Sequence, residues 1–478
     1  MLTLINTNRM TPAIAPIGLD YIAGSARQAD IEVEVVDLCL VDDPAATLRN
    51  YFAGHSPELV GLSFRNVDDC FWPSCEWFVP RLAETVQTIR KLTDSPIVIG
   101  GVGFSIFAEQ IVEHTGADFG IRGDGEQAII ALIEQLRWMQ NFDKVTGLVW
   151  RKNGTLISNP PCWQSVFGGL TLDTARDVID NVAYFKLGGQ IGLETKRGCN
   201  RRCIYCADRL SKGAVIRRRK AAEVANEAQS LLAKGIDVLH ICDSEFNIPR
   251  SHAIEVCSEF ARLGLGKQLR WYTYMAVTPF DAELAAAMRK AGCVGIDFTG
   301  DSASATMLNT YRQPHTKEDL ASAVRLCREN GITVMIDLLL GGPGETPQTA
   351  KETIDFVKQI NPDAAGAPLG VRVYPGTEME TIVKSEGPME TNPNIRRKYD
   401  GKIDLFRPTF YISKSLGDRP ARLIKDLIAG DKRFFEPIDE IGGTATDHNY
   451  NDNSELVKAI QNGARGAYWH ILRKLRSA

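Results

Sequence analysis

Three cysteines close together in the middle of the chain offer the clearest chemistry in the sequence. Cys199, Cys203 and Cys206 have the spacing CxxxCxxC and follow a short apolar stretch at 191–194. Thiolates are soft ligands that suit zinc or an iron–sulfur cluster. A structural zinc site takes four ligands, usually as two close pairs, but no fourth Cys or His lies nearby in sequence. The spacing therefore favours a four-iron cluster with one iron left open. The alternatives are three buried cysteines, or a zinc loop completed by a distant residue.

The composition is that of an ordinary globular chain, with 478 residues and a formal net charge of -4. That charge gives no overall electrostatic case for nucleic acid binding. The sequence shows neither the pattern of a secretory signal nor an apolar run of about 18 residues, so we expect a cytoplasmic protein without a membrane span. The 11 cysteines, an odd number, cannot all pair, and in a reducing compartment they indicate packing, metal binding or catalysis.

Strand and helix patterns alternate through residues 1–140, which predicts βαβ units and a parallel sheet. Helices are expected after Pro16 and over 82–92, where apolar residues recur on one face. Ligands of such sheets bind beyond the carboxyl ends of the strands. The predicted strands are 2–6, 31–36, 59–64, 96–99 and 116–121, and the loops that follow them are 6–15, 65–70, 100–105 and 122–126.

A hairpin and a second set of βα units follow. Asn153-Gly154 between two short strand patterns predicts the hairpin, which we interpret as a linker. Six further βα units predict a partial barrel rather than an eightfold one. Its expected strands are 191–194, 238–242, 270–275, 294–299, 333–340 and 370–374, and its helices include 221–233, 282–291 and 318–330.

The predicted fold class is α/β with four segments. These are a Rossmann-like parallel sheet domain (1–140), a linker with a β-hairpin (141–185), a partial (β/α)6 barrel (186–385) and a small, mostly helical capping domain (386–478) that ends in an amphipathic helix near 456–475.

With these elements around it, the cysteine segment resembles the radical S-adenosylmethionine (SAM) enzymes. Residues 196–206 read KRGCNRRCIYC, and Tyr205 fits the aromatic position before the third cysteine. In that family three cysteines hold a [4Fe-4S] cluster inside a partial βα barrel, and the open iron chelates SAM. The resemblance spans about 186–380 and implies that Cys199, Cys203 and Cys206 are the cluster ligands and the catalytic centre. Arg197, Arg201 and Arg202 would offset the charge of the cluster.

Four segments at predicted strand ends resemble the SAM-contacting motifs of that family. DSEFN at 243–247 resembles the motif that holds the SAM amino group, although a helix N-cap is the alternative. TGDS at 299–302 stands where the family has Glu-Ser, GGPGET at 341–346 resembles the turn near adenine, and VYPGT at 373–377 closes the sixth strand. The residues thereby assigned to SAM are Tyr205, Asp243, Ser244, Glu245, Asp301, Ser302, Gly342 and Tyr374.

The first domain resembles the cobalamin-binding subgroup of the same enzymes. No GxGxxG follows the first strand, which counts against a dinucleotide site. The loop 6–12, NTNRMTP, lacks the histidine that ligates cobalt in mutase-type domains, so cobalamin is expected without a protein histidine ligand. A degenerate domain that binds no cobalamin is the alternative. The residues that the resemblance assigns to cobalamin are Asn8, Pro16, Gly18, Arg65, Asn66, Gly100, Gly101, Phe104, Gly123 and Glu126.

Several other side chains stay open to interpretation. No two of the seven histidines have a metal-binding spacing such as HxxxH. Cys70 and Cys75 follow the third strand and are candidates for a catalytic thiol, and Cys162 is unassigned. The run RRRK at 217–220 is interpreted as a solvated helix start.

The resemblance implies a cobalamin-dependent radical SAM C-methyltransferase. Such an enzyme cleaves SAM to a 5′-deoxyadenosyl radical, which takes hydrogen from an unactivated carbon that then receives the methyl group of methylcobalamin. The expected substrate is a small specialised metabolite of the antibiotic-intermediate type, aromatic or carrier-linked, and the expected electron donor is a flavodoxin or ferredoxin. The alternatives are cyclisation, ring contraction or carbon–carbon coupling with the same cofactors, and a non-catalytic sensor of redox state or corrinoid.

Overall fold

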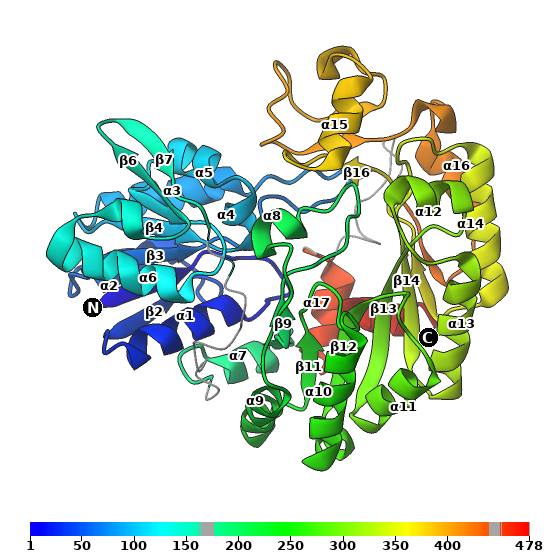
Figure 1. Cartoon of the computed structure of the whole chain (residues 1–478), viewed down its shortest axis with the longest axis horizontal. Coiled ribbons are helices and arrows are strands. Elements are labelled where there is room, and N and C mark those ends of the chain that lie inside the picture. The colour runs from blue at the N-terminus through cyan, green and yellow to red at the C-terminus, as the bar shows by residue number, and fades with distance from the viewer. Residues whose placement is uncertain (162, 164–175, 439–449, 451, 478) are drawn as a thin grey trace.

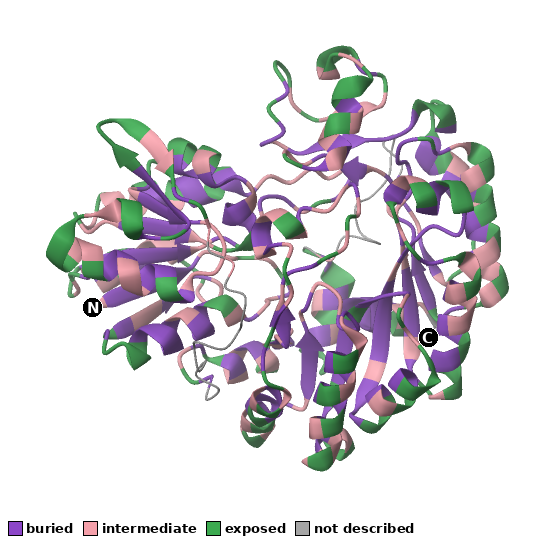
Figure 2. Ribbon diagram, in the orientation of Figure 1, coloured by how far each residue is buried: buried purple, intermediate pink, exposed green. Residues whose placement is uncertain are grey.

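The computed structural model describes residues 1–161, 163, 176–438, 450 and 452–477. Two seven-stranded sheets organise this chain, one in each half of the molecule (Figure 1). Both are buried, while the outer faces of their helices are exposed (Figure 2). Among the described residues, no helix combines the length and the apolar character needed to cross a membrane.

The first sheet has the strand order β2-β1-β3-β4-β5-β6-β7. The first five strands in the chain are parallel, as predicted, and β6 and β7 form an antiparallel hairpin that pairs with β5. The hairpin that we interpreted as a linker therefore extends the first sheet. The strands are β1 (Leu2–Asn6), β2 (Val33–Asp37), β3 (Leu59–Ser63), β4 (Ile97–Gly100), β5 (Phe119–Ile121), β6 (Leu148–Lys152) and β7 (Thr155–Ser158).

Helices cover both faces of this sheet because its strands are apolar on both sides. Leu2 and Leu4 pack with the core of α1 and α6, whereas Ile5 packs with the core of α3 and α5. This two-sided burial is typical of parallel sheets. The helices are α1 (Ile17–Gln28), α2 (Pro44–Phe52), α3 (Val79–Arg90), α4 (Val102–Ile106), α5 (Ala108–Thr115) and α6 (Glu126–Glu134). The π-helix η1 (Gln135–Met139) and the 3-10 turn η2 (Phe142–Lys144) lead to the hairpin, and α7 (Asn181–Lys186) leads to the second half.

The second sheet is a partial barrel with the order β19-β15-β14-β13-β12-β11-β8, all parallel. Its outer face packs against the helices through residues such as Phe298, which contacts Phe280. The strands are β8 (Gly192–Leu193), β11 (Val238–Ile241), β12 (Arg270–Ala276), β13 (Cys293–Asp301), β14 (Thr333–Leu338), β15 (Ala364–Gly366) and β19 (Phe434–Phe435). The helices that follow its strands are α9 (Ala221–Ala233), α10 (Arg250–Arg262), α11 (Ala282–Lys290), α12 (Ala305–Tyr311), α13 (Lys317–Glu329) and α14 (Pro347–Ile360), with the 3-10 turn η3 (Leu265–Lys267) after α10.

The sixth barrel strand differs from the prediction. Residues 364–366, Ala-Ala-Gly, form β15 in the barrel sheet, although they lack the β-branched and aromatic residues that mark a strand in sequence. The segment predicted for this position, 370–374, contains β16 (Val371–Arg372), which joins a separate antiparallel sheet with β18 (Thr409–Tyr411) and β17 (Ile395–Arg397). Prediction of 370–374 as a barrel strand was therefore wrong.

The C-terminal residues both cap and close the barrel. After α15 (Glu378–Ser385), η4 (Met389–Thr391), η5 (Lys414–Leu416) and α16 (Pro420–Ile428), the chain returns to the sheet as β19. The expected terminal helix is two helices, α17 (Ser454–Gln461) and α18 (Tyr468–Ser477), separated by a segment that contains Gly463 and Gly466 with positive φ. Leu456 and Trp469 pack against Tyr272 near the start of β12, so these helices lie at the amino end of the barrel strands.

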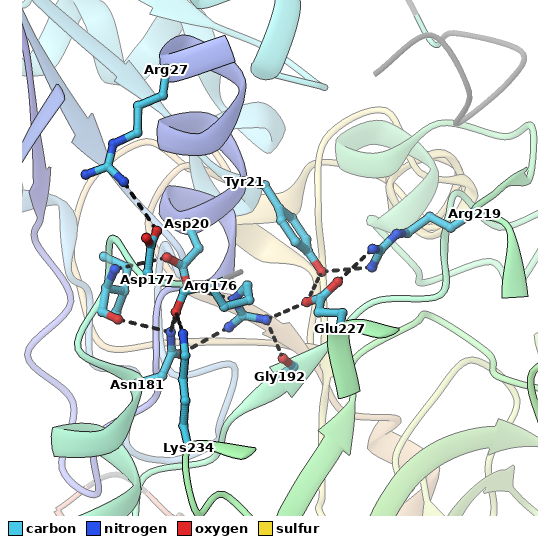
Figure 3. Close-up of polar contacts among 11 residues, drawn as sticks. Asp20, Tyr21, Arg27, Arg176, Asp177, Asn181, Gly192, Arg219, Glu227 and Lys234 are labelled. Atoms are coloured by element: carbon cyan, nitrogen blue, oxygen red, sulfur yellow. Dashed lines mark hydrogen bonds and ion pairs between the residues drawn. The ribbon is translucent and has the colours of Figure 1, made fainter. Parts of the chain in front are cut away.

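A buried network of charged side chains joins the two halves (Figure 3). Arg176 donates to Asp20 of α1 at 2.6 Å and to Glu227 of α9 at 2.7 Å. Tyr21 of α1 donates to the same glutamate at 3.0 Å and accepts a hydrogen bond from Arg219. All five side chains are almost completely buried. A buried charge is costly without a partner, so this network fixes the first sheet against the barrel.

Candidate active site

The three cysteines lie on a loop at the junction of the two halves. The loop begins after β9 (Lys196–Arg197) and ends before α8 (Asp208–Lys212), which packs against α4 of the first half. A Cβ on Gly198 would stand 2.2 Å from the carbonyl oxygen of Val215, just before β10 (Arg217–Arg218), so only glycine fits where the chain turns into the cysteines. The amide of Cys199 donates to the carbonyl of Gly213 at 3.1 Å, which anchors the start of the loop.

The environment of the cysteines suits a cluster whose metal displaces their protons. Burial raises the pKa of all three thiols, that of Cys203 to about 12, so they stay protonated until a metal binds. Among the described residues, no group of three His, Cys, Asp or Glu side chains is already arranged around one point, so the three thiols are not preset for a metal ion in this structure. A four-iron cluster instead places each thiolate on its own iron.

One face of the cysteine loop contacts the carboxyl end of β13. The Tyr205 hydroxyl donates to Asp301 at 2.6 Å, and the Gln313 amide donates to the same carboxylate at 2.5 Å and to the sulfur of Cys203 at 3.3 Å. Burial raises the pKa of Asp301 to about 7, although both hydrogen bonds lower it. Gln313 was not predicted. It follows α12 in a polar loop, where no spacing or motif distinguishes it.

In the DSEFN segment, Asp243 and Ser244 form hydrogen bonds within the protein, whereas Glu245 lies near the cysteines. Asp243 is buried and accepts hydrogen bonds from Lys196 at 2.6 Å and from the hydroxyl of Thr195 at 2.5 Å, so its carboxylate is engaged within the protein. Ser244 donates to Asp208 of α8. Glu245 accepts a hydrogen bond from Thr299 at 3.0 Å, and it raises the pKa of both Cys199 and Cys203 by charge repulsion.

Glu245 has the features of a group that binds a cation. Its second oxygen is buried and has no hydrogen-bond partner among the described residues. Burial raises its pKa to about 8, so a positive charge nearby would favour its ionised form.

The remaining residues assigned to SAM lie in different surroundings. Ser302 is buried and shares a hydrogen bond of 2.7 Å with Thr353 of α14. The amide of Gly342 donates to the hydroxyl of Tyr311, and a Cβ at this glycine would lie 2.2 Å from that oxygen. Tyr374 lies beyond β16 and donates to the sulfur of Cys70 at 3.7 Å, so it faces the first half of the chain.

Three of the residues assigned to cobalamin line one pocket at the carboxyl ends of β1 and β3. Asn8, Arg65 and Asn66 are among the residues around this space, and none of the described residues that line it is a histidine. The buried side-chain nitrogen of Asn8 has no hydrogen-bond partner among the described residues. An unpartnered amide at these strand ends suits a polar cofactor.

Other residues assigned to cobalamin shape the first domain instead. Phe104 is completely buried, and a Cβ on Gly120 would clash with its ring. Glu126 forms an ion pair of 2.6 Å with Arg197 at the junction. Gly101 and Gly123 have positive φ, and Gly100 ends β4. Pro16 and Gly18 stand at the start of α1, where nothing lies within 4 Å of a Cβ on Gly18.

The arginines differ from their predicted roles. Arg217 and Arg219 are buried in ion pairs with Asp124 and Glu227, so the interpretation of 217–220 as a solvated helix start was wrong for these two residues. Arg197 is held by Glu126, Asp124 and Glu194, while Arg201 lowers the pKa of Cys199 and donates to the carbonyl of Thr278. The sequence did not reveal the acidic partners of these arginines, because they come close only when the two halves of the chain pack together.

Neither candidate thiol is activated. Burial raises the pKa of Cys75 to about 12, and the pKa of Cys70, whose residue is exposed, is raised rather than lowered. A nucleophilic cysteine needs the opposite shift. Cys162 lies outside the described residues.

Comparisons with known proteins agree with this arrangement. Residues 5–133 match the B12 binding domain and residues 193–357 match the radical SAM superfamily. The tryptophan 2-C-methyltransferase of Streptomyces laurentii is 27% identical over 98% of this chain and 94% of its own length. The radical SAM methyltransferase TsrM of Kitasatospora setae, solved with tryptophan and a SAM analogue, is 30% identical with a TM-score of 0.92, covering 100% of this chain and 97% of that one.

A second structure of the Kitasatospora setae enzyme, with cobalamin and a [4Fe-4S] cluster bound, is 29% identical and has a TM-score of 0.90 over the same shares of both chains. The first domain match covers the parallel strands of the first sheet and the second covers most of the barrel strands, while the similarity to the solved structures extends over the whole chain. The chain therefore belongs to the family of cobalamin-dependent radical SAM methyltransferases.

Proposed function

We propose that this enzyme methylates a ring carbon of tryptophan or of a closely related indole amino acid. The observation that carries the proposal is the extent of the similarity: a tryptophan 2-C-methyltransferase matches over 98% of this chain. The match includes the C-terminal part, which returns to the barrel sheet as β19 and packs at the amino end of its strands. The finer expectation of an aromatic specialised metabolite agrees with this proposal.

Cys199, Cys203 and Cys206 would hold the cluster, and Glu245 and Asp301 lie near enough to the Cys203 thiol for their charges to raise its pKa. Glu245, with one unpartnered oxygen, is suited to the ammonium group of SAM. Tyr205 and Gln313 fix the carboxylate of Asp301 beside the cysteine loop. The glycine at 342 allows Tyr311 to approach the backbone where the resemblance expects adenine. When bound, SAM would supply the methyl group.

Cobalamin would occupy the carboxyl end of the first sheet, with Asn8, Arg65 and Asn66 around its pocket. Since no histidine lines that pocket, its lower face would have no protein imidazole. When bound, cobalamin would carry the methyl group between SAM and the substrate. The buried ion pairs at the junction hold the two proposed cofactor regions against each other.

The proposal is tested with protein reconstituted anaerobically with iron, sulfide and hydroxocobalamin. It is incubated with L-tryptophan and SAM that carries a deuterated methyl group, and the products are analysed by mass spectrometry and NMR. We expect tryptophan with the deuterated methyl on a ring carbon. Absence of that product from protein that has bound both cofactors would contradict the proposed substrate. A rearranged product without added methyl would favour the alternative of cyclisation or coupling.

We propose that a flavodoxin or ferredoxin donates electrons to the cluster, as the resemblance to the radical SAM enzymes implies. In a reaction without a chemical reductant, addition of a reduced flavodoxin should increase the rate of product formation.

A further inference from the structure

Two carboxylates lie inside the barrel, below the cysteine loop. Asp297 is in the middle of β13, and Asp337 is near the end of the neighbouring strand β14. Thr299 pairs in register with Asp337, and Thr299 is two residues from Asp297, so all three side chains point to the same face of the sheet. That face is the inner one, because Thr299 donates to Glu245, whereas Phe298 points outward to Phe280. We call Asp297 and Asp337 the carboxylate pair.

No cation among the described residues forms an ion pair with the carboxylate pair. Asp297 is 3% exposed, and its Oδ1 atom has no hydrogen-bond partner among the described residues. Within the same part of the chain, neither aspartate forms an ion pair, and no Lys, Arg or His lowers the pKa of either. Burial raises both pKa values, and Asp337 further raises that of Asp297. An uncompensated buried carboxylate is costly, so the pair is suited to a positively charged ligand.

Aromatic side chains surround the carboxylate pair. Tyr274 of β12 pairs in register with Asp297, so the two point to the same side, and 38% of Tyr274 is exposed although it lies in a central strand. Tyr450 lies close enough to both aspartates for their charges to raise its pKa, and its ring lies 6.0 Å from that of Tyr468. Among the described residues, the charges around the pair are those of Glu245, of Arg65 of the first half beside Tyr274, and of Arg476 of α18 beside Tyr450.

The position of the pair suits a ligand that extends toward the cofactors. Asp297 and Asp301 are four residues apart on β13, which corresponds to roughly 13 Å along the strand. Asp301 contacts the cysteine loop through Tyr205. A ligand whose cation lies at Asp297 and Asp337 therefore directs its other end toward the proposed cluster and cobalamin.

We propose that Asp297 and Asp337 bind the ammonium group of the substrate, while Tyr274 packs against its aromatic ring. The ligand class is an aromatic amine or amino acid. This inference rests on the proposed function, because the methylated ring would then lie between the pair and the cofactors. It names the feature by which the substrate is recognised, a charged amino group bound by two carboxylates on adjacent strands.

Binding to the reconstituted enzyme tests the inference with three probes. L-Tryptophan and tryptamine carry the ammonium group, whereas indole-3-propionate carries the same ring without it. We expect Asp297→Asn and Asp337→Asn each to weaken binding of tryptamine at least tenfold in calorimetry and to leave binding of indole-3-propionate unchanged or stronger. Tyr274→Ala should weaken all three probes. The exposed Asp400→Asn serves as the matched control and should bind every probe as the wild type does.

The outcomes separate the subsite from the proposed function. If tryptamine binding depends on both aspartates but no methyltryptophan forms, the ammonium subsite stands and the proposed substrate is wrong. If methyltryptophan forms and both Asn variants keep the wild-type KM for tryptophan, the function stands and the subsite is overturned. Equal weakening of tryptamine and indole-3-propionate in the Asn variants also overturns it, because it reveals a structural defect instead of loss of a charge contact.

Discussion

Asp337→Asn should stabilise the cofactor-free protein while it impairs substrate binding. Burial raises the pKa of Asp337 from its ordinary 3.8 to about 6. The folded state therefore holds the proton more tightly than the unfolded state does, so stability falls as the pH rises between these two values. Since each tenfold change in proton affinity is worth about 1.4 kcal/mol, the charged carboxylate costs the folded protein about 3 kcal/mol near pH 7.5. Asparagine, neutral at every pH, removes that cost.

The assay is urea unfolding of the wild type, Asp337→Asn and Asp400→Asn, followed by circular dichroism. We expect Asp337→Asn to be more stable by about 3 kcal/mol near pH 7.5 and by about 2 kcal/mol near pH 5.5, where part of the wild-type carboxylate is already protonated. The control should match the wild type at both pH values. A less stable Asp337→Asn variant near pH 7.5 would refute the reasoning, because it would show that the carboxylate has a stabilising partner in the folded protein.

Three further changes test other parts of the account. Arg197→Ala leaves the buried Glu126 without its partner at 2.6 Å and should lower the free energy of unfolding by about 3 kcal/mol. Arg197→Lys should restore part of this free energy. An Ala variant as stable as the wild type would show that the ion pair does not hold the halves together. Gly342→Ala places a Cβ 2.2 Å from the Tyr311 hydroxyl and should raise the KM for SAM at least tenfold, with kcat affected less; an unchanged KM would remove this turn from the SAM site. Cys70→Ser should keep full activity, because the pKa of this thiol is raised, whereas a nucleophilic cysteine needs a lowered one; a hundredfold loss would identify a catalytic cysteine.

Local patterns predicted the elements of this chain well where one face of each element is apolar. The helix predicted over 221–233 is α9, Ala221–Ala233, and the five parallel strands of the first sheet lie within a few residues of their expected positions. β15 escaped prediction because Ala-Ala-Gly has no strand signature, and its burial depends on neighbours that are distant in sequence. Tyr374 was assigned to the barrel because its segment has the sequence pattern of a strand. That strand, β16, pairs with β18 in a separate sheet.

The sequence predicted the parts of the site that are defined by spacing along the chain. It did not predict the parts that are defined by packing of distant elements. The cysteine loop is a local motif, and Gly198 explains why it turns there. Asp243 and Glu245 belong to the same sequence motif. Only the fold shows that Asp243 accepts a hydrogen bond from Lys196, while one oxygen of Glu245 has no partner among the described residues. The carboxylate pair of Asp297 and Asp337 was not predicted, because two aspartates 40 residues apart have no meaning until neighbouring strands bring them together.

Formation of methylated tryptophan by the reconstituted enzyme tests the central claim most directly. The wild type and the variant with Cys199, Cys203 and Cys206 all changed to Ala are compared under anaerobic conditions, with SAM that carries a deuterated methyl group and Cys70→Ser as the matched cysteine control. The account predicts a labelled methyl on the indole ring with the wild type and with Cys70→Ser, and neither product nor iron–sulfur absorbance with the triple variant. Labelled product from the triple variant would contradict the assignment of the cluster and, with it, of the active site.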